Sequence, residues 1–370
     1  MNDMNKETHI LSIVGARPQF VKAAVVSKAL ADTGIRESLL HTGQHYDASM
    51  SDVFFEELGI PNPTHHLGIG SGSHGQQTGR MLEQIEQVIL DAGPDRVLVY
   101  GDTNSTLAGA LAAAKLHVPV DHVEAGLRSF NRRMPEELNR VTTDHLSSTL
   151  FAPTTIAVRN LDDEGIRGDR VVHSGDVMYD ATLAAAKIAD RTSTILERLD
   201  VSPKEFILAT IHRAENTDDP DILRKIFESL ADVAGTIPVV LPLHPRTRKA
   251  LEHIDLLQFA IERLRVCEPL GYLDMTRLEA AARVVATDSG GVQKEAFFHR
   301  VPCVTLRTET EWVELVDLGW NTICDPSHGD VAGAILAARS PATTDDRPYG
   351  DGDASRIIAE HIANDLPIRA

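Results

Sequence analysis

Short apolar runs alternate with longer helix-compatible segments along the whole chain. In the first half, runs that end in glycine or a polar residue lie at residues 10–14, 97–100 and 119–125. The segment at residues 103–117 is rich in alanine and leucine, with Asp102 or Thr103 available as an N-cap. This alternation predicts a parallel sheet covered by helices on both faces.

The same pattern starts again after a helical segment near residues 179–199. Further apolar runs lie at residues 206–211, 239–243, 264–270, 283–289, 303–307 and 321–325. A chain of 370 residues is also long enough for two hydrophobic cores. We therefore predict an α/β protein of two Rossmann-like, doubly wound domains, residues 1–175 and 176–351, with a C-terminal helix in 352–370 packing back on the first. Ligands of such sheets bind beyond the carboxyl ends of the strands, so the active site is expected in the interdomain cleft.

Composition and charge exclude several classes of partner. The net charge of −18 argues against a nucleic-acid surface, which needs a positive field. No apolar run approaches the ~20 residues of a membrane helix, and the polar N-terminus does not resemble a secretory signal. We expect a cytoplasmic protein without a membrane partner. The three cysteines form no CxxC pair, and His41 and His45 flank a Gly-Gln turn, so no metal site is expected.

A GxGxxG match at residues 70–75 does not predict a dinucleotide site. Such a fingerprint follows the first strand of a βαβ unit, whereas the run before it, residues 61–67, is a poor strand. The HExxH, GxSxG and P-loop motifs are absent from the sequence. We expect no NAD and no other cofactor.

Two segments favour an anionic ligand. In residues 287–296, two glycines open a helix after a strand, so backbone N–H groups can approach a diphosphate, with a carboxylate one turn later for ribose hydroxyls. The residues concerned are Ser289, Gly290, Gly291 and Glu295. An ordinary helix start with a surface glutamate is an equally good reading of that segment. In residues 15–23, Arg17 and Lys22 follow the first strand. These two cations could form an anion site, or they could be ordinary surface charges.

Carboxylates and a histidine also follow predicted strands. Asp102 and Glu136 stand at helix N-termini, where acids also suit the helix dipole. Glu124 ends an apolar strand, where a buried charge must be paired or functional. Converging acids suit proton transfer, and His212, after the first strand of the second domain, is a candidate proton carrier.

The motifs resemble the non-hydrolysing UDP-N-acetylglucosamine 2-epimerases. They occur in family order at residues 15–23, 41–47, 100–106, 122–129, 134–140, 173–180, 211–216, 287–296 and 311–312. The resemblance implies two domains similar to the glycosyltransferase-B fold, a cytoplasmic homodimer and a UDP-sugar substrate. It implies inversion at carbon 2 by elimination and re-addition of UDP through a 2-acetamidoglucal.

Residue by residue, the resemblance implies a complete site. Its catalytic groups are Asp102, Glu124, Glu136 and His212. Its substrate and UDP contacts are Arg17, Lys22, Arg140, Ser289, Gly290, Gly291 and Glu295. Further sugar or activator contacts are Gln44, His45, Arg132, Arg133 and Arg213.

Two departures from the family pattern matter. Residues 312–314 are Trp-Val-Glu where some members have Arg-Pro-Glu, so a nucleotide-binding arginine is missing or replaced, with Arg307 as a candidate. Tyr46 stands where those members have arginine, which argues against activation by a second UDP-N-acetylglucosamine.

Residues 70–81 and 129–140 look like a sub-branch that acts on UDP-2,3-diacetamido-2,3-dideoxyglucuronic acid. There, Arg132 and Arg133 would fork onto a substrate carboxylate, or else pair with nearby acids in their loop. A hydrolysing 2-epimerase and a glycosyltransferase of the same fold are the remaining alternatives.

Overall fold

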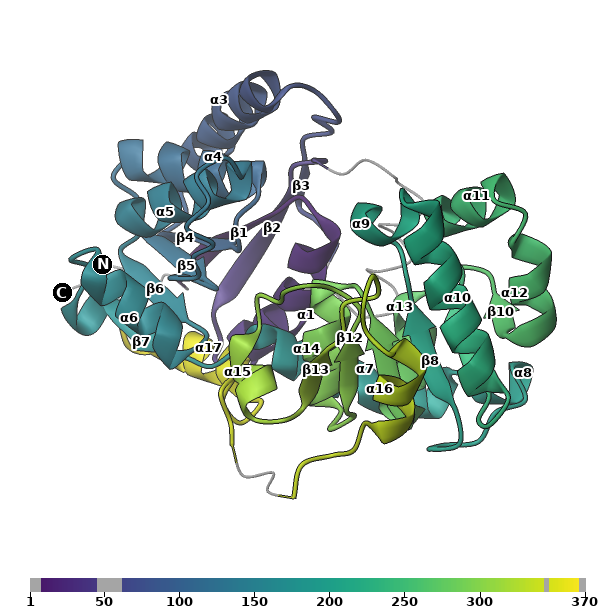
Figure 1. The fold of residues 1–370 in the computed structure, drawn as a ribbon. Coiled ribbons are helices and arrows are strands. Elements are labelled where there is room, and N and C mark those ends of the chain that lie inside the picture. Colours follow the sequence, from purple (N-terminus) through teal and green to yellow (C-terminus); the bar gives the residue numbers. More distant parts are fainter. Residues whose placement is uncertain (1–7, 45–61, 343–345, 366–370) are drawn as a thin grey trace, which may run out of the picture. The chain divides into compact units, whose positions relative to one another are not determined.

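The computed structural model describes residues 8–44, 62–342 and 346–365. The chain divides into two compact units (Figure 1). Unit 1 comprises Met1–Ala181 and Arg347–Ala370, and unit 2 comprises Thr182–Asp346. Each unit contains one parallel sheet with flanking helices, which confirms the predicted α/β class with two doubly wound sheets.

Unit 1 has seven strands in the order β3-β2-β1-β4-β5-β6-β7, and every pairing is parallel. The strands are β1 (His9–Val14), β2 (Arg36–His41), β3 (His65–His66), β4 (Arg96–Tyr100), β5 (Val120–Val123), β6 (Thr149–Ala152) and β7 (Val171–His173). The helices are α1 (Arg17–Asp32), α3 (His74–Ala92), α4 (Asn104–Lys115), α5 (Pro135–Leu146), α6 (Thr155–Asp163), α7 (Val177–Thr192, which continues into unit 2) and α17 (Ala354–Asn364), with a 3₁₀ turn at Gly168–Arg170.

The central strands of unit 1 are buried on both faces. On β1, Ile10 and Val14 pack against one hydrophobic cluster, which includes α1 and α17, while Leu11 and Ile13 pack against another, which includes α3 and α4. This two-residue alternation explains why a strand covered on both sides is apolar at most positions.

Unit 2 has six parallel strands in the order β10-β9-β8-β11-β12-β13. They are β8 (Ile207–Thr210), β9 (Val239–Pro242), β10 (Arg265–Cys267), β11 (Val284–Thr287), β12 (Cys303–Thr305) and β13 (Asn321–Ile323). The helices are α8 (Ile195–Arg198), α9 (Ala214–Thr217), α10 (Pro220–Ala234), α11 (Pro245–His253), α12 (Leu257–Arg263), α13 (Tyr272–Ala281), α14 (Gly290–Phe298), α15 (Val313–Asp317) and α16 (Val331–Ala337).

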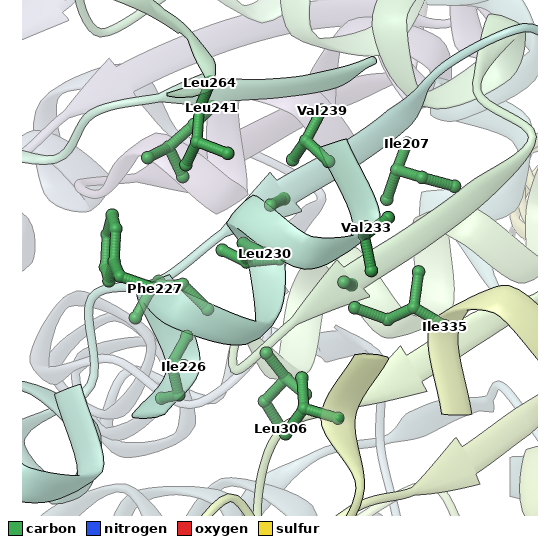
Figure 2. Packing of buried hydrophobic residues seen from close by; sticks show 14 of the residues in the cluster. Ile207, Ile226, Phe227, Leu230, Val233, Val239, Leu241, Leu264, Leu306 and Ile335 are labelled. Carbon is green, nitrogen blue, oxygen red and sulfur yellow. The ribbon is translucent and has the colours of Figure 1, made fainter. Parts of the chain in front are cut away.

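Helix α10 shows how sequence builds this core. Asp219 caps its first turn by accepting from the backbone N–H groups of Asp221 and Ile222. Its buried residues recur at helical spacing and pack on the sheet (Figure 2). They are Leu223, Ile226, Phe227, Leu230 and Val233.

A buried ion pair ties the strands of unit 1 together at the ends away from the candidate site. Arg96 on β4 donates two hydrogen bonds to Asp121 on β5, at 2.7 and 2.6 Å, and a third to Thr149 on β6 at 2.9 Å. Its remaining nitrogen meets Asp365, after α17, at 3.1 Å. Burial by itself lowers the pKa of Arg96, but the Asp121 and Asp365 carboxylates raise it overall.

We expect Asp121→Asn to lower the Tm by roughly 10 °C. Removal of one partner of a buried ion pair costs about 3–5 kcal/mol, and each kcal/mol shifts the Tm by about 2–4 °C in a domain of this size. Differential scanning calorimetry measures the shift. Asp365→Asn is the matched control, because the Asp365 side chain is 52% exposed and its pairing is screened. Equal shifts in the two variants would contradict the prediction.

Candidate active site

The first group of candidate residues lies at the carboxyl edge of the unit 1 sheet. The neighbouring strands β1, β4 and β5 end at Val14, Tyr100 and Val123, and the segments after them carry the predicted cations and acids. A cavity of about 210 Å³ opens there. It is lined by Ala16, Pro18, Gln19, Lys22, Gln44, His74, Gly101, Asp102, Thr103, Asn104, Pro135, Glu136 and Asn139.

Asp102 is held from two sides on the rim of this cavity. Its carboxylate accepts a hydrogen bond from the Arg140 guanidinium, and its carbonyl accepts one from the Asn139 amide at 2.9 Å. Gly101 turns the chain at φ +62°, and Lys22 Nζ lies 3.5 Å from where a Cβ at Gly101 would be. The turn therefore brings Asp102 and Lys22 close together.

Glu124 occupies a backbone conformation that few glutamates adopt. Its φ is +73°, a left-handed value whose cost is of order 1–3 kcal/mol. The N–H groups of Glu124 and Ala125 both donate to the Phe151 carbonyl, at 3.1 and 3.0 Å, which fixes the turn. The carboxylate forms an ion pair with Lys22. Backbone strain at a paired acid beside a cavity is typical of a functional position.

The adjacent acids of α5 have different surroundings. Glu136 is exposed and lines the cavity. Glu137 is buried and accepts hydrogen bonds from Ser129, from Phe130 and from Arg140. Burial by itself raises the pKa of Glu137, but these hydrogen bonds and the Arg140 charge hold it below its ordinary value. Glu137 therefore anchors the loop before α5 and orients Arg140, which in turn binds Asp102.

The remaining predicted residues of unit 1 lie in three environments. Gln44 lines the cavity and accepts from the Ser105 backbone and hydroxyl, at 3.0 and 2.7 Å. Arg132 and Arg133 are exposed, and neither forms an ion pair with any residue that the structure describes. His45 and the side chain of Arg17 lie outside the described residues.

The second group lies at the carboxyl edge of the unit 2 sheet. His212 follows β8, and Asp288 follows the neighbouring strand β11. The fully buried Asp288 accepts from the N–H groups of His212 and Arg213 and from Asn216, at 3.0 to 3.1 Å. The His212 ring is partly exposed, with Nδ1 3.3 Å from Asp288. Asp288 therefore orients the imidazole.

The predicted phosphate segment forms a helix start. Ser289 is the N-cap of α14, and Gly290 and Gly291 are its first residues. A Cβ on Gly291 would meet no atom closer than 4.0 Å, so the glycine leaves its N–H approachable. Glu295 is half-buried one turn later. Burial and the charge of Glu295 raise the pKa of the nearby buried Glu279 well above its ordinary value.

Arg213 and Arg307 meet on one carboxylate. Their guanidinium groups lie 3.4 and 2.8 Å from Glu311, respectively. Burial by itself raises the pKa of Glu311, but Arg307 and Arg213 lower it overall. Arg307 is thus already paired in this structure, and the Trp312 indole donates to the Gly290 carbonyl at 2.7 Å.

Metal and membrane sites are absent from the part of the chain that the structure describes. No group of three or more His, Cys, Asp or Glu side chains there could hold a metal ion. Across residues 8–44, 62–342 and 346–365, no helix combines the length and apolar character needed to cross a bilayer.

A chain of two Rossmann-like units that matches a family of sugar-nucleotide epimerases is an isomerase of sugar nucleotides with a glycosyltransferase-B-like fold. Residues 28–363 match the family model described as UDP-N-acetylglucosamine 2-epimerase. The chain belongs to this family, as the motifs indicated.

Several members of the family align with this chain over nearly their whole length. The Pseudomonas aeruginosa UDP-2,3-diacetamido-2,3-dideoxy-D-glucuronate 2-epimerase is 52% identical, over 96% of this chain and 99% of its own. The Methanocaldococcus jannaschii UDP-N-acetylglucosamine 2-epimerase is 43% identical, over 94% and 96%. A crystal structure of a Methanocaldococcus jannaschii UDP-GlcNAc 2-epimerase in complex with UDP-GlcNAc and UDP has a TM-score of 0.81 and 41% identity, over 96% and 100%.

Sequence reasoning missed the residues that hold the site together. Gln19 accepts from the N–H groups of Gly15 and Ala16 and donates to the Tyr100 carbonyl, Thr103 and Thr106, so it joins the ends of β1 and β4. Asp288 and Glu137 play similar parts. In the sequence, each of these residues is visible only as a polar residue inside an apolar run or a catalytic motif. That pattern does not reveal which group the residue contacts.

Proposed function

We propose that this protein interconverts UDP-N-acetylglucosamine and UDP-N-acetylmannosamine without releasing the free sugar. The observation that carries the proposal is the group of three carboxylates and two cations at one sheet edge, in a chain of this family. These residues are Asp102, Glu124, Glu136, Lys22 and Arg140.

The substrate explains why several acids are needed. Carbon 2 of an N-acetylhexosamine has no adjacent carbonyl, so its hydrogen is not acidic enough for direct removal. As the C1–O bond to UDP breaks, the electron pair leaves with UDP, and loss of the proton at carbon 2 forms the C1–C2 double bond of a 2-acetamidoglucal. A proton then adds to the opposite face of carbon 2 while UDP re-forms the bond at carbon 1.

Inversion requires proton transfer on both faces of the ring, so one carboxylate is not enough. We assign Asp102, Glu124 and Glu136 to this acid–base chemistry. Lys22 and Arg140 supply positive charge beside two of them, and their charges stabilise anionic oxygens without further rearrangement. Each well-placed acid or base contributes typically ~10²–10⁴-fold.

The groups of unit 2 supply what the leaving nucleotide needs. The N-terminal end of α14 offers free N–H groups and a favourable potential to the diphosphate. Glu295 suits the ribose hydroxyls, and His212 and Arg213 assist the departing phosphate as proton carrier and cation. Gln44 and His45 are assigned to the sugar.

Product analysis tests the proposal. Incubation with UDP-N-acetylglucosamine in D₂O should give an equilibrium with UDP-N-acetylmannosamine that carries deuterium at carbon 2. Proton NMR monitors both the equilibrium and the deuterium content. Free N-acetylmannosamine plus UDP would identify a hydrolysing enzyme, and sugar transfer to an acceptor would identify a glycosyltransferase. Either result, or retention of the original hydrogen at carbon 2, would overturn the proposal.

A second substrate, UDP-2,3-diacetamido-2,3-dideoxyglucuronate, is favoured by two observations. The 52% identity to the Pseudomonas aeruginosa enzyme named for it exceeds the 43% to the UDP-N-acetylglucosamine enzyme above. Arg132 and Arg133 are exposed and have no ion-pair partner among the described residues. Two guanidinium groups in the loop that leads into α5, the helix of Glu136, suit the carboxylate of a uronic acid.

If the uronate is the substrate, Arg132→Ala and Arg133→Ala will each lower its kcat/KM by about 10-fold or more, because a charge-assisted hydrogen bond contributes ~1.5–3 kcal/mol. The kcat/KM for UDP-N-acetylglucosamine should change less than threefold. Arg159→Ala, at an exposed arginine of α6, is the control. Equal losses for both nucleotides would reject a role in carboxylate recognition.

We also propose that the enzyme works in the cytoplasm as a homodimer. The three free cysteines fit a reducing compartment. Analytical ultracentrifugation tests whether the protein is a dimer. A monomer at micromolar protein concentration would contradict this part of the proposal.

A further inference from the structure

A buried pair, His122 and Asp144, contacts the backbone of the segments that carry the acids of unit 1. His122 is on β5 and Asp144 near the end of α5, and the exposed fraction of both is 0%. His122 Nδ1 is 2.7 Å from Asp144 Oδ1, and His122 Nε2 is 2.7 Å from the Gly101 carbonyl oxygen. The proposed reaction uses neither side chain.

The carbonyl partner determines where one ring hydrogen lies. A backbone carbonyl can only accept, so His122 Nε2 must donate to Gly101. The other ring nitrogen, Nδ1, faces the Asp144 carboxylate. Burial by itself raises the pKa of Asp144, but His122 and Arg128 hold it below its ordinary value. Both ring nitrogens of His122 are therefore held by buried partners, the Gly101 carbonyl and the Asp144 carboxylate.

The second oxygen of Asp144 extends the connection. Asp144 Oδ2 accepts from the Gly126 N–H at 3.1 Å and lies 2.7 Å from Arg128 Nη1. Gly126 cannot be replaced there, since its φ is +80° and a Cβ would lie 2.4 Å from the Ala157 carbonyl oxygen. This oxygen thus fixes the turn that follows Glu124.

These bonds join the three segments that carry the acids. Gly101 immediately precedes Asp102, Gly126 follows Glu124 by two residues, and Asp144 is on the same helix as Glu136. The His122–Asp144 pair therefore fixes the backbone of all three. Resting on the function proposed above, we infer that His122 and Asp144 are positioning residues that set the spacing of Asp102, Glu124 and Glu136 for proton transfer at carbon 2.

The pair does not itself exchange protons with substrate. Neither side chain lines the cavity, and the Nε2 hydrogen bond ends on a carbonyl that cannot pass a proton on. Its effect should therefore appear in the rate of the chemical step, where a displacement of about 1 Å can cost ~10²-fold, and not in binding of UDP.

Two isosteric substitutions separate the two hydrogen bonds. The amide nitrogen of asparagine takes the place of Nδ1, so His122→Asn keeps the bond to Asp144 and releases Gly101. The amide nitrogen of glutamine takes the place of Nε2, so His122→Gln holds Gly101 and releases Asp144. We expect both to lower kcat by about 10–100-fold, with the Kd for UDP, from calorimetry, within twofold of wild type.

Asp121→Asn is the matched control. Asp121 is the neighbouring residue on β5, is equally buried and is ion-paired. Among the described residues, the hydrogen-bond partners of the Arg96 side chain are Asp121, Thr149 and Asp365, and none of them belongs to a catalytic segment. This variant should lose stability while kcat, measured below its Tm, stays within twofold of wild type. If Asp121→Asn lowers kcat as much as the His122 variants do, general loosening explains the result and the inference is overturned.

Wild-type activity separates this inference from the proposed function. If the wild type converts neither UDP-sugar, the proposed function fails. If the wild type is active and a folded His122→Asn or His122→Gln keeps kcat within twofold, only the positioning role fails.

A measurement on the wild type covers the case in which both variants misfold. Protein labelled with ¹⁵N-histidine should show one ring whose Nε2-bound hydrogen exchanges slowly with solvent, because the fully buried Nε2 donates to the Gly101 carbonyl. The absence of such a ring would overturn the inference.

Discussion

Asp102→Asn is expected to lower kcat for the epimerisation of UDP-N-acetylglucosamine by roughly 10²–10⁴-fold, the range for loss of a well-placed acid or base. Asparagine has the same shape and can still accept the hydrogen bond from Arg140, while the carbonyl that Asn139 holds is unchanged. The fold and the cavity should therefore persist, and the loss should report the missing proton acceptor. NMR of the substrate and product measures it, together with deuterium incorporation at carbon 2.

The control for this substitution is Asp32→Asn, at an exposed carboxylate near the end of α1. It makes the same change in net charge away from the sheet edge and should leave kcat unchanged. An Asp102→Asn variant with near-normal turnover and deuterium incorporation would remove Asp102 from the acid–base chemistry. The proton at carbon 2 would then belong to Glu124 or Glu136.

His212→Asn should lower kcat by a similar factor, roughly 10²–10⁴-fold, through loss of the imidazole as proton carrier. The backbone N–H of residue 212 still donates to Asp288, so the turn after β8 should stay in place. UDP should bind with near-normal affinity, because its other proposed contacts in unit 2, the start of α14, Glu295 and Arg213, are unchanged. Turnover and UDP calorimetry, carried out on the same preparation, separate the two effects.

His253→Asn, at an exposed histidine in the last turn of α11, is the matched control for the loss of one imidazole. If His212→Asn keeps wild-type turnover, the leaving nucleotide needs no imidazole. If UDP affinity falls in parallel with kcat, His212 binds the nucleotide and is not its proton carrier.

The six strands of unit 2 all fall within the apolar runs that the sequence predicts, whereas of the seven described strands of unit 1 only β1, β4 and β5 overlap one. Apolar runs such as residues 10–14 and 97–100 became buried central strands, because a strand covered on both faces has no polar side to interrupt it. The edge strand β3 is only His65–His66 and could not be predicted, since two residues give no periodicity.

The candidate site was predicted less completely. Strand ends pointed to Asp102 and Glu124, since carboxyl ends of parallel strands meet at one edge of a sheet. Residue type alone does not distinguish the neighbouring glutamates of α5, and it was the family resemblance that implied Glu136. Glu136 reaches the cavity while Glu137 is buried against Ser129 and Phe130, and only the direction of each side chain from the helix decides this.

By itself, the sequence determined the α/β class with two doubly wound sheets, the family and the side chains available for chemistry, because periodicity and motif order are local properties of the chain. The tertiary structure alone decided the pairing of these groups. Lys22 meets Glu124, Arg140 meets Asp102, and His122 joins Gly101 to Asp144, across separations along the chain that no spacing rule covers. The physical reason is that burial obliges each charge and N–H group to find a partner, and folding determines which partners are within reach.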